Sequence, residues 1–142
     1  GQGQGVAGDQ HGRRIVVRRR TEFDLAAAAA AFADRVGAGA SFHGGGLVTD
    51  RPDSPHLLAS KIKARMYFGI ASNDDMRQPD AKDKLKETFG AAKVTAEIEV
   101  YPAKHGWCVS DMPADATGPI YSMPDAERAW GKLVALYKAG LA

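Results

Sequence analysis

The sequence predicts an α/β fold, a three-layer sandwich in which helices cover both faces of a mostly parallel sheet. Two observations carry this prediction. Segments with strand character alternate along the chain with segments of helical periodicity. The segment Ala64 to Ala71 also contains the continuous apolar run Met66 to Ile70, which is typical of a parallel strand buried on both faces.

Eight segments account for most of the chain after residue 23. In order, we expect a helix over Asp24 to Asp34, a strand over Val36 to Phe42, a long loop, a strand over Ala64 to Ala71, a helix over Pro79 to Ala92, a strand over Ala96 to Tyr101, a loop over Ala103 to Ser122 and a helix over Pro124 to Lys138. Alanine, the strongest helix former, dominates the first helix. The alternation of polar and apolar residues in the last strand is typical of a sheet edge.

The two later helices are amphipathic. Leu85 and Phe89 recur at helical spacing after Pro79, which fits the first turn of a helix because it needs no donor there. The final helix aligns Ala126, Trp130, Leu133 and Tyr137, and we expect this face, including Trp130, to pack on the sheet.

Residues 1 to 22 form a low-complexity, basic segment. Five of the first 20 residues are arginine, and glycine and glutamine repeats precede them. We expect poor order here unless Ile15 to Val17 pairs as a short strand. The rest of the chain holds 14 basic and 16 acidic residues, a balance that does not favour nucleic acid or an anionic membrane as a partner.

Composition bears on the cellular compartment in which the protein works. One cysteine, Cys108, among 142 residues cannot form an internal disulfide, which fits a reducing compartment, and we expect a cytoplasmic location. No apolar run approaches the length that crosses a bilayer, so no membrane association is expected. Gly3 to Gly8 matches a dinucleotide-binding pattern only formally, because it neither follows a predicted strand nor opens a helix.

An acidic loop and a histidine loop each follow a predicted strand. Asp75 comes after the strand that ends at Ala71, and His105 after the strand that ends at Tyr101. Neighbouring parallel strands present their carboxyl ends at one edge of the sheet, so the two side chains are expected to meet there as the acid and base of a hydrolytic triad. Asp74 competes for this role, and the proline four residues after Asp75 favours Asp75. The alternative is that Asp75 caps the next helix and His105 is an ordinary loop residue.

Four segments together form a more specific pattern: Phe32 to Gly45, Asn73 to Pro79, His105 to Trp107, and Tyr121 to Tyr137. With them, the chain between about Ala31 and Leu141 resembles the dienelactone hydrolase (carboxymethylenebutenolidase) family of α/β hydrolases. The resemblance implies a hydrolase that opens esters or lactones of small molecules with a Cys, Asp, His triad. Asp75 and His105 match the second and third members, and neither a metal nor an organic cofactor is expected.

The chain departs from the family pattern at the nucleophile. A Gly-x-Cys-x-Gly-Gly elbow is expected just before the first helix, where this sequence has Val17 to Glu22. A shifted reading frame is one explanation, since codons CGG, CGG, CGG, ACT and GAG for Arg18 to Glu22 read Gly-Gly-Gly-Leu-Ser one base later. Residues 23 to 142 would then be the C-terminal part of such a domain. Cys108 is a weak alternative nucleophile, because a lone cysteine more often packs as a small apolar residue.

Three further residues bear on the substrate. His43 opens a His-Gly-Gly-Gly loop at the functional edge of the sheet and is expected, together with Trp107, to line the substrate site. Trp107 could equally be a packing residue. Family members that hold a substrate carboxylate have an arginine where this chain has Val109, so a less charged ester or lactone is an alternative to dienelactone as the substrate. The competing function is an inactive remnant or interaction domain that self-associates through an exposed sheet edge.

Overall fold

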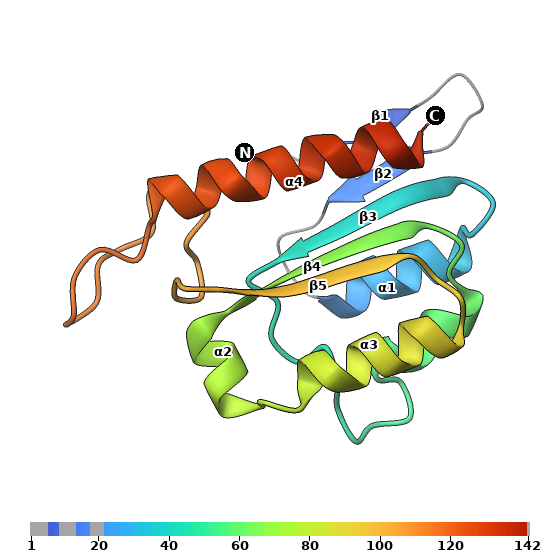
Figure 1. The fold of residues 1–142 in the computed structure, drawn as a ribbon, viewed down its shortest axis with the longest axis horizontal. Helices are drawn as coiled ribbons and strands as arrows, with labels where there is room; N and C mark the ends of the chain where they lie inside the picture. The colour runs from blue at the N-terminus through green and yellow to red at the C-terminus, as the bar shows by residue number, and fades with distance from the viewer. Residues whose placement is uncertain (1–5, 9–13, 18–21, 142) are drawn as a thin grey trace.

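The computed structural model describes residues 6–8, 14–17 and 22–141, and side chains from Leu25 onward. In the described residues, five strands form one sheet in chain order: β1 (Val6–Gly8), β2 (Arg14–Val17), β3 (Val36–Phe42), β4 (Arg65–Ala71) and β5 (Ala96–Tyr101). β1 pairs antiparallel with β2, and all other neighbours are parallel. The predicted mostly parallel α/β sandwich is confirmed (Figure 1).

Helices cover both faces of this sheet. They are α1 (Glu22–Ala31), the 3₁₀ helix η1 (Pro55–Lys61), α2 (Ser72–Arg77), α3 (Ala81–Ala91) and α4 (Met123–Gly140). Figure 1 shows α1 and α3 below the sheet and α4 alone above it. Successive residues of a strand face opposite sides of the sheet. Met66, Phe68 and Ile70 therefore join the core between the sheet and helices α1 and α3, whereas Tyr67 and Ala71 join the core between the sheet and α4.

Most predicted elements are confirmed. The strands at Val36–Phe42 and Ala96–Tyr101 have the expected bounds, and β5 lies at a sheet edge as its alternating pattern indicated. Ile15 to Val17, which we considered as a short strand and the exception to poor order in the basic segment, lies in β2. Three of the described elements were not predicted: β1 near the start of the chain, η1 within the long loop, and α2 in the acidic segment that follows β4. A six-residue helix is too short to leave a periodic signature in the sequence.

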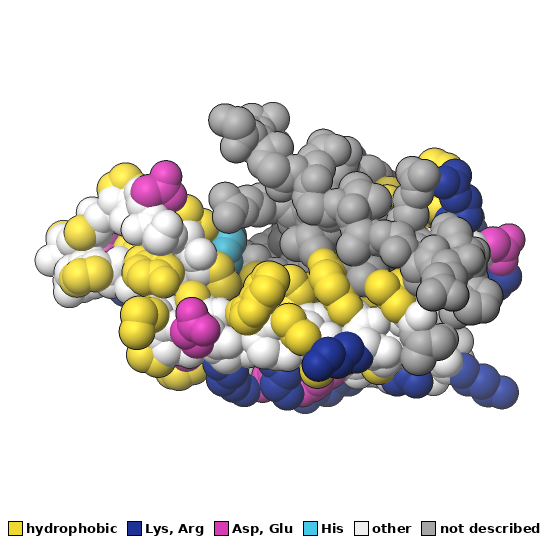
Figure 2. All heavy atoms as spheres, turned by 90° about the horizontal axis from the view of Figure 1, so that it is seen from above, with side chains coloured by type: hydrophobic (Ala, Val, Ile, Leu, Met, Phe, Trp, Pro, Cys, Tyr) yellow, Lys and Arg dark blue, Asp and Glu magenta, His cyan; other side chains and the backbone are white. Residues whose placement is uncertain are grey.

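The predicted packing face of the last helix is confirmed at Leu133 and Tyr137, which lie in or against the core, and is wrong at Trp130. Trp130 is 61% exposed, and the buried residues of α4 are Ala129, Leu133 and Gly140. A Cβ atom on Gly140 would lie 2.7 Å from Cβ of Ala38, so the helix contacts β3 too closely there for any larger side chain. Hydrophobic side chains therefore remain along the outer side of α4, as the view from that side shows (Figure 2).

A partly buried polar network connects α4 to the sheet. The hydroxyl group of Tyr67 donates to Glu99 and lies 2.7 Å from the hydroxyl of Tyr101. Glu99 also accepts from Arg128 of α4, whose guanidinium group lies 4.5 Å from the centre of the Tyr101 ring. Burial, together with the hydrogen bond to Glu99, raises the pKa of Tyr67 well above its ordinary value, so its hydroxyl stays protonated as a donor.

In the part of the chain that the structure describes, no helix combines the length and apolar character that a membrane span requires.

Candidate active site

The carboxyl ends of the parallel strands define the candidate site. His43 directly follows β3, α2 begins directly after β4, and His105 lies four residues beyond the end of β5. β2 ends at Val17 and α1 begins at Glu22, so the connection between them leaves the same edge. The topology thus collects four connections at one edge, which is where open α/β sheets place their chemistry.

The imidazole ring of His105 is held by Asp74. Its Nδ1 atom lies 2.7 Å from Oδ2 of Asp74. Because a carboxylate only accepts hydrogen bonds, the contact requires a proton on Nδ1 and leaves Nε2 as the proton acceptor when the ring is neutral. The Asp74 side chain is 10% exposed, whereas that of His105 is 51% exposed, so a shielded carboxylate orients an accessible imidazole.

The expectation that Asp75 faces His105 is corrected by this geometry. Oδ1 of Asp75 accepts a hydrogen bond of 2.7 Å from Nζ of Lys82, which also donates to the carbonyl oxygen of Pro79. The reason is α2: consecutive residues of a helix point about 100° apart. With α2 beginning at Ser72, Asp74 faces the loop after β5 and Asp75 faces the start of α3. The hydrogen bond from Lys82 explains why Asp75 lies in the first turn of a helix without bonding to its backbone.

The second oxygen of Asp74 faces a cation. Nη1 of Arg77, three residues later on α2, lies 3.7 Å from Oδ1. Gly45, in the loop after β3, approaches the same carboxylate, since a Cβ atom added there would lie 3.7 Å from Oδ1. The Asp74 side chain therefore extends from α2 to a position between the loop after β3 and the loop after β5.

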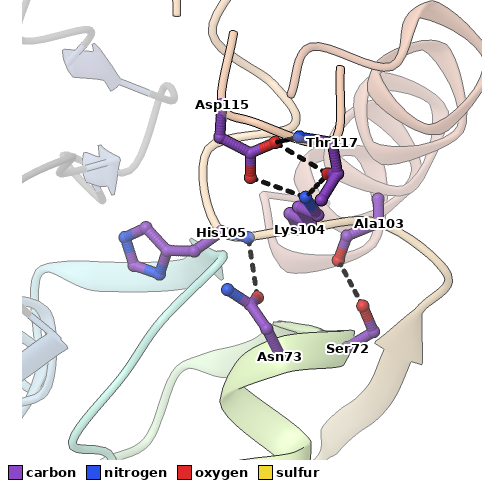
Figure 3. Close-up of polar contacts among 7 residues, drawn as sticks. All are labelled: Ser72, Asn73, Ala103, Lys104, His105, Asp115 and Thr117. Atoms are coloured by element: carbon purple, nitrogen blue, oxygen red, sulfur yellow. Dashed lines mark hydrogen bonds and ion pairs between the residues drawn. The ribbon is translucent and has the colours of Figure 1, made fainter. Parts of the chain in front are cut away.

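The backbone of His105 is also fixed. Its N–H donates to Oδ1 of Asn73 at 2.9 Å, while the hydroxyl group of Ser72 donates to the carbonyl oxygen of Ala103 (Figure 3). In the same view, Lys104 turns away from the imidazole and bonds to Asp115 and Thr117. The hydrogen bonds from Lys104 and Thr117 lower the pKa of Asp115, so that carboxylate remains charged and ties the loop together.

His43 lies beside His105, as expected for a residue of the site. The two imidazole rings are 5.1 Å apart at 63°, and His43 makes a second edge contact, at 5.2 Å and 78°, with Trp107. Its φ angle is +51°, a left-handed conformation that is uncommon for residues other than glycine and recurs at functional sites. The N–H of His43 donates to the carbonyl oxygen of Gly69 at 2.8 Å, which holds this turn against β4.

The structure places Trp107 behind the site rather than on its surface. Its ring is fully buried and stacks on Tyr101, with centroids 4.5 Å apart and an interplanar angle of 20°. A ring without exposed area offers no contact to a substrate, so the packing interpretation of Trp107 replaces the expected substrate contact. Cys108 is partly buried and packs against the same cluster. Trp107 therefore supports the ring of His43 from behind.

Among the residues that the structure describes, no group of three His, Cys, Asp or Glu side chains is arranged to bind a metal ion.

A comparison with protein families identifies the chain. The model of the dienelactone hydrolase family matches residues 24–141. The chain belongs to this family. It shares the fold of solved dienelactone hydrolases, one of them a proposed dienelactone hydrolase from Klebsiella pneumoniae subsp. pneumoniae MGH 78578, with a TM-score of 0.64 and 21% identity over 80% of this chain. A second structure, named m3DLH, matches with a TM-score of 0.60, also at 21% identity over 80% of this chain.

The chain spans 46% of the length of each of these two structures. A comparison with curated protein sequences finds no significant match. The family match begins at residue 24, just after the start of α1, and includes His43, Asp74 and His105.

Sequence reasoning missed one residue of this site, Asn73. Its side chain holds the backbone of His105, but an asparagine beside two aspartates after a strand also fits an ordinary turn or helix start. No sequence signal separates these roles, because the partner is 32 residues away.

Proposed function

We propose that this dienelactone hydrolase family member carries the acid–base half of an ester or lactone hydrolase, with His105 as the base and Asp74 as its orienting carboxylate. The observation that carries the proposal is the 2.7 Å contact between Nδ1 of His105 and Oδ2 of Asp74. It supports a ring whose Nε2 atom accepts a proton, the arrangement that nucleophilic hydrolysis requires.

In the proposed reaction, Nε2 of His105 removes a proton from a nucleophile as that nucleophile attacks the carbonyl carbon of the ester. The imidazolium that forms is stabilised by the Asp74 carboxylate, and its proton then passes to the leaving alcohol. Water releases the acyl group by the same proton transfers in reverse order. His43, whose ring contacts that of His105, is proposed to line the substrate side of this site.

The family nucleophile belongs to the connection between β2 and α1, which leaves the same edge of the sheet as Asp74 and His105. In this sequence residues 18–21 read Arg-Arg-Arg-Thr, without cysteine or serine, and they lie outside the described residues. This observation favours a second candidate function, a catalytically inactive domain that keeps the fold and its acid–base pair. The two candidates differ in whether His105 supports turnover.

An ester assay separates them. Purified chain would be incubated with p-nitrophenyl acetate, and His105→Ala compared with His56→Ala, a matched loss of an imidazole that lies on η1 outside the site. A hydrolase predicts multiple turnovers that are lost in His105→Ala and kept in His56→Ala. Equal rates in both variants, or no rate above buffer, would show that the chain is not a hydrolase for this ester.

The residue at position 109 supports a proposal about the substrate. Val109 is partly buried in the loop that carries His105, four residues after it, and its aliphatic side chain offers no charge to a substrate carboxylate. We therefore expect a neutral ester to be hydrolysed faster than an ester of similar size that carries a carboxylate. Val109→Arg should narrow or reverse that preference, and a preference for the anionic ester in the unaltered chain would contradict the proposal.

A further inference from the structure

Three consecutive residues at the start of α2 bond to the loop that carries His105. The backbone N–H of Ser72 donates to the carbonyl oxygen of Ala103 at 2.9 Å, and the Ser72 hydroxyl group donates to the same oxygen at 3.1 Å. Oδ1 of Asn73 accepts the backbone N–H of His105 at 2.9 Å. Oδ2 of Asp74 accepts a hydrogen bond of 2.7 Å from Nδ1 of the His105 ring.

Beyond the strands, the backbone continues the pairing by one bond, from Ser72 to Ala103, and the further bonds to the loop come from side chains. The parallel pairing of β4 with β5 ends at Ala71 and Tyr101, and the next residue of the β5 side, Pro102, has no N–H to offer. At Ser72 the chain enters a helix, so its carbonyl groups turn along the helix axis and away from the loop. The Asn73 side chain supplies the acceptor that a strand carbonyl would otherwise have supplied to His105.

The consequence concerns the ring of His105. The hydrogen bond that Nδ1 of His105 donates to Asp74 fixes the ring only relative to the carboxylate, and a shift of the backbone would carry Nε2 away from any partner. Asn73 fixes the backbone of the same residue from the adjacent position in the same helix turn. Asn73 and Asp74 belong to the same helical turn, so the backbone and the ring of His105 are both fixed relative to that turn. Catalytic side chains require positions fixed in this way.

We infer that Asn73 is a positioning residue for His105, acting by holding its backbone N–H so that the imidazole keeps its contact with Asp74. The catalytic consequence of this role rests on the proposed function, whereas the structural consequence does not. Ser72 provides a natural comparison, because it bonds to the same loop through Ala103 without touching His105.

The test uses nitrogen NMR of ¹⁵N-histidine-labelled full chain together with amide hydrogen exchange. In the unaltered chain, neutral His105 should be the Nδ1–H tautomer. In Asn73→Ala, exchange of the His105 amide should accelerate about tenfold, and signals of both tautomers should appear. Asn73→Asp keeps an oxygen acceptor at this position and should restore slow exchange and the single tautomer. Ser72→Ala, which keeps the backbone bond to Ala103, should leave both measurements unchanged.

The inference is overturned if Asn73→Ala keeps the single tautomer and slow exchange, or if Ser72→Ala disturbs His105 as much as Asn73→Ala does. Thermal unfolding of each variant checks that the fold persists, and Asn73→Asp provides the decisive comparison where Asn73→Ala does not fold. The readouts do not depend on turnover: a chain that fails to hydrolyse p-nitrophenyl acetate but shows these shifts contradicts the proposed function and supports the role of Asn73.

Discussion

Oδ2 of Asp74 lies 2.7 Å from Nδ1 of His105, although 31 residues separate them in the sequence. Asp75, the immediate neighbour of Asp74, instead bonds to Lys82 on α3. The chain therefore offers two adjacent carboxylates with the same chemistry and different partners. Substitutions at the two positions can therefore be compared directly, because only Asp74 contacts His105, the proposed base.

Asp74→Asn is expected to lower His105-dependent ester hydrolysis on the order of a hundredfold or more, because a neutral amide neither fixes the productive tautomer nor stabilises the imidazolium. Asp75→Asn should leave the rate within a factor of about two. Its pairing with Lys82 is partly exposed and should contribute little to the free energy of unfolding. Measured kcat/KM values decide this prediction, and a larger loss in Asp75→Asn would reverse the assignment of the acid.

The network under α4 predicts a loss of stability in acid. Burial favours the neutral form of Glu99, but the hydrogen bond from Tyr67 and the charges of Arg128 and Lys132 outweigh it and lower the pKa of Glu99 below its ordinary value. Between the two pKa values the unfolded chain binds more protons than the folded one. The contribution of Glu99 is therefore present above the ordinary pKa of about 4.5 and is lost as the pH falls through the lower value.

Glu99→Gln should accordingly flatten the fall in unfolding free energy between pH 5 and acid, measured by urea denaturation at a series of pH values. Glu97→Gln provides the control, because Glu97 lies two residues earlier on β5, bonds to Lys132 and is 53% exposed in its side chain. A control that flattens the curve as much as Glu99→Gln would show that surface charge, and not the partly buried network, sets the acid sensitivity.

A second pH effect is expected from His56 on η1. Burial and the nearby charge of Lys84 lower the pKa of His56, and Nδ1 of its ring lies 2.6 Å from the hydroxyl group of Ser54. Since the Ser54 oxygen already accepts the N–H of Thr49, its proton is free to be donated to an unprotonated Nδ1. The folded state thus prefers neutral His56, so unfolding free energy should fall as the pH drops below the ordinary value of 6.5. His56→Gln should remove this fall near neutral pH, and an unchanged slope would contradict the assignment.

Two glycines of α4 should respond to alanine in opposite directions. No described atom lies within 4 Å of a Cβ added to Gly131, so Gly131→Ala should stabilise the protein by about 0.5 to 1 kcal/mol through helix propensity. A Cβ on Gly140 would lie 2.7 Å from Cβ of Ala38 and 2.8 Å from the backbone oxygen of Gly37. Gly140→Ala should cost about 1 to 3 kcal/mol. Urea or thermal unfolding measures both, and a neutral Gly140→Ala would show that α4 shifts freely on the sheet.

Much of the fold follows from local pattern. The strands β3, β4 and β5 were predicted because each carries a local signal. Burial on both faces requires an apolar run, and a position at the sheet edge gives an alternation of polar and apolar residues. The first, third and fourth helices were predicted from alanine content and helical spacing. In contrast, α2 escaped prediction because six residues do not complete two turns.

The face of α4 shows where pattern misleads. Hydrophobicity favoured Trp130 for the core, yet the helix buries Ala129, Leu133 and Gly140. Small residues such as Gly140 allow α4 to approach β3 closely, and in this orientation of the helix Trp130 faces outward. The sequence does not report the distance between layers, so it could not predict this choice.

The sequence by itself determined that a carboxylate and a histidine would meet at one edge of a parallel sheet, because chain order and strand direction fix which loops leave that edge. Only the tertiary structure decided that the carboxylate is Asp74, that Asn73 holds the backbone of His105, and that Trp107 lies behind the site. Those choices depend on where a short helix begins and which way each residue of its first turn points, and a difference of one residue rotates a side chain by about 100°.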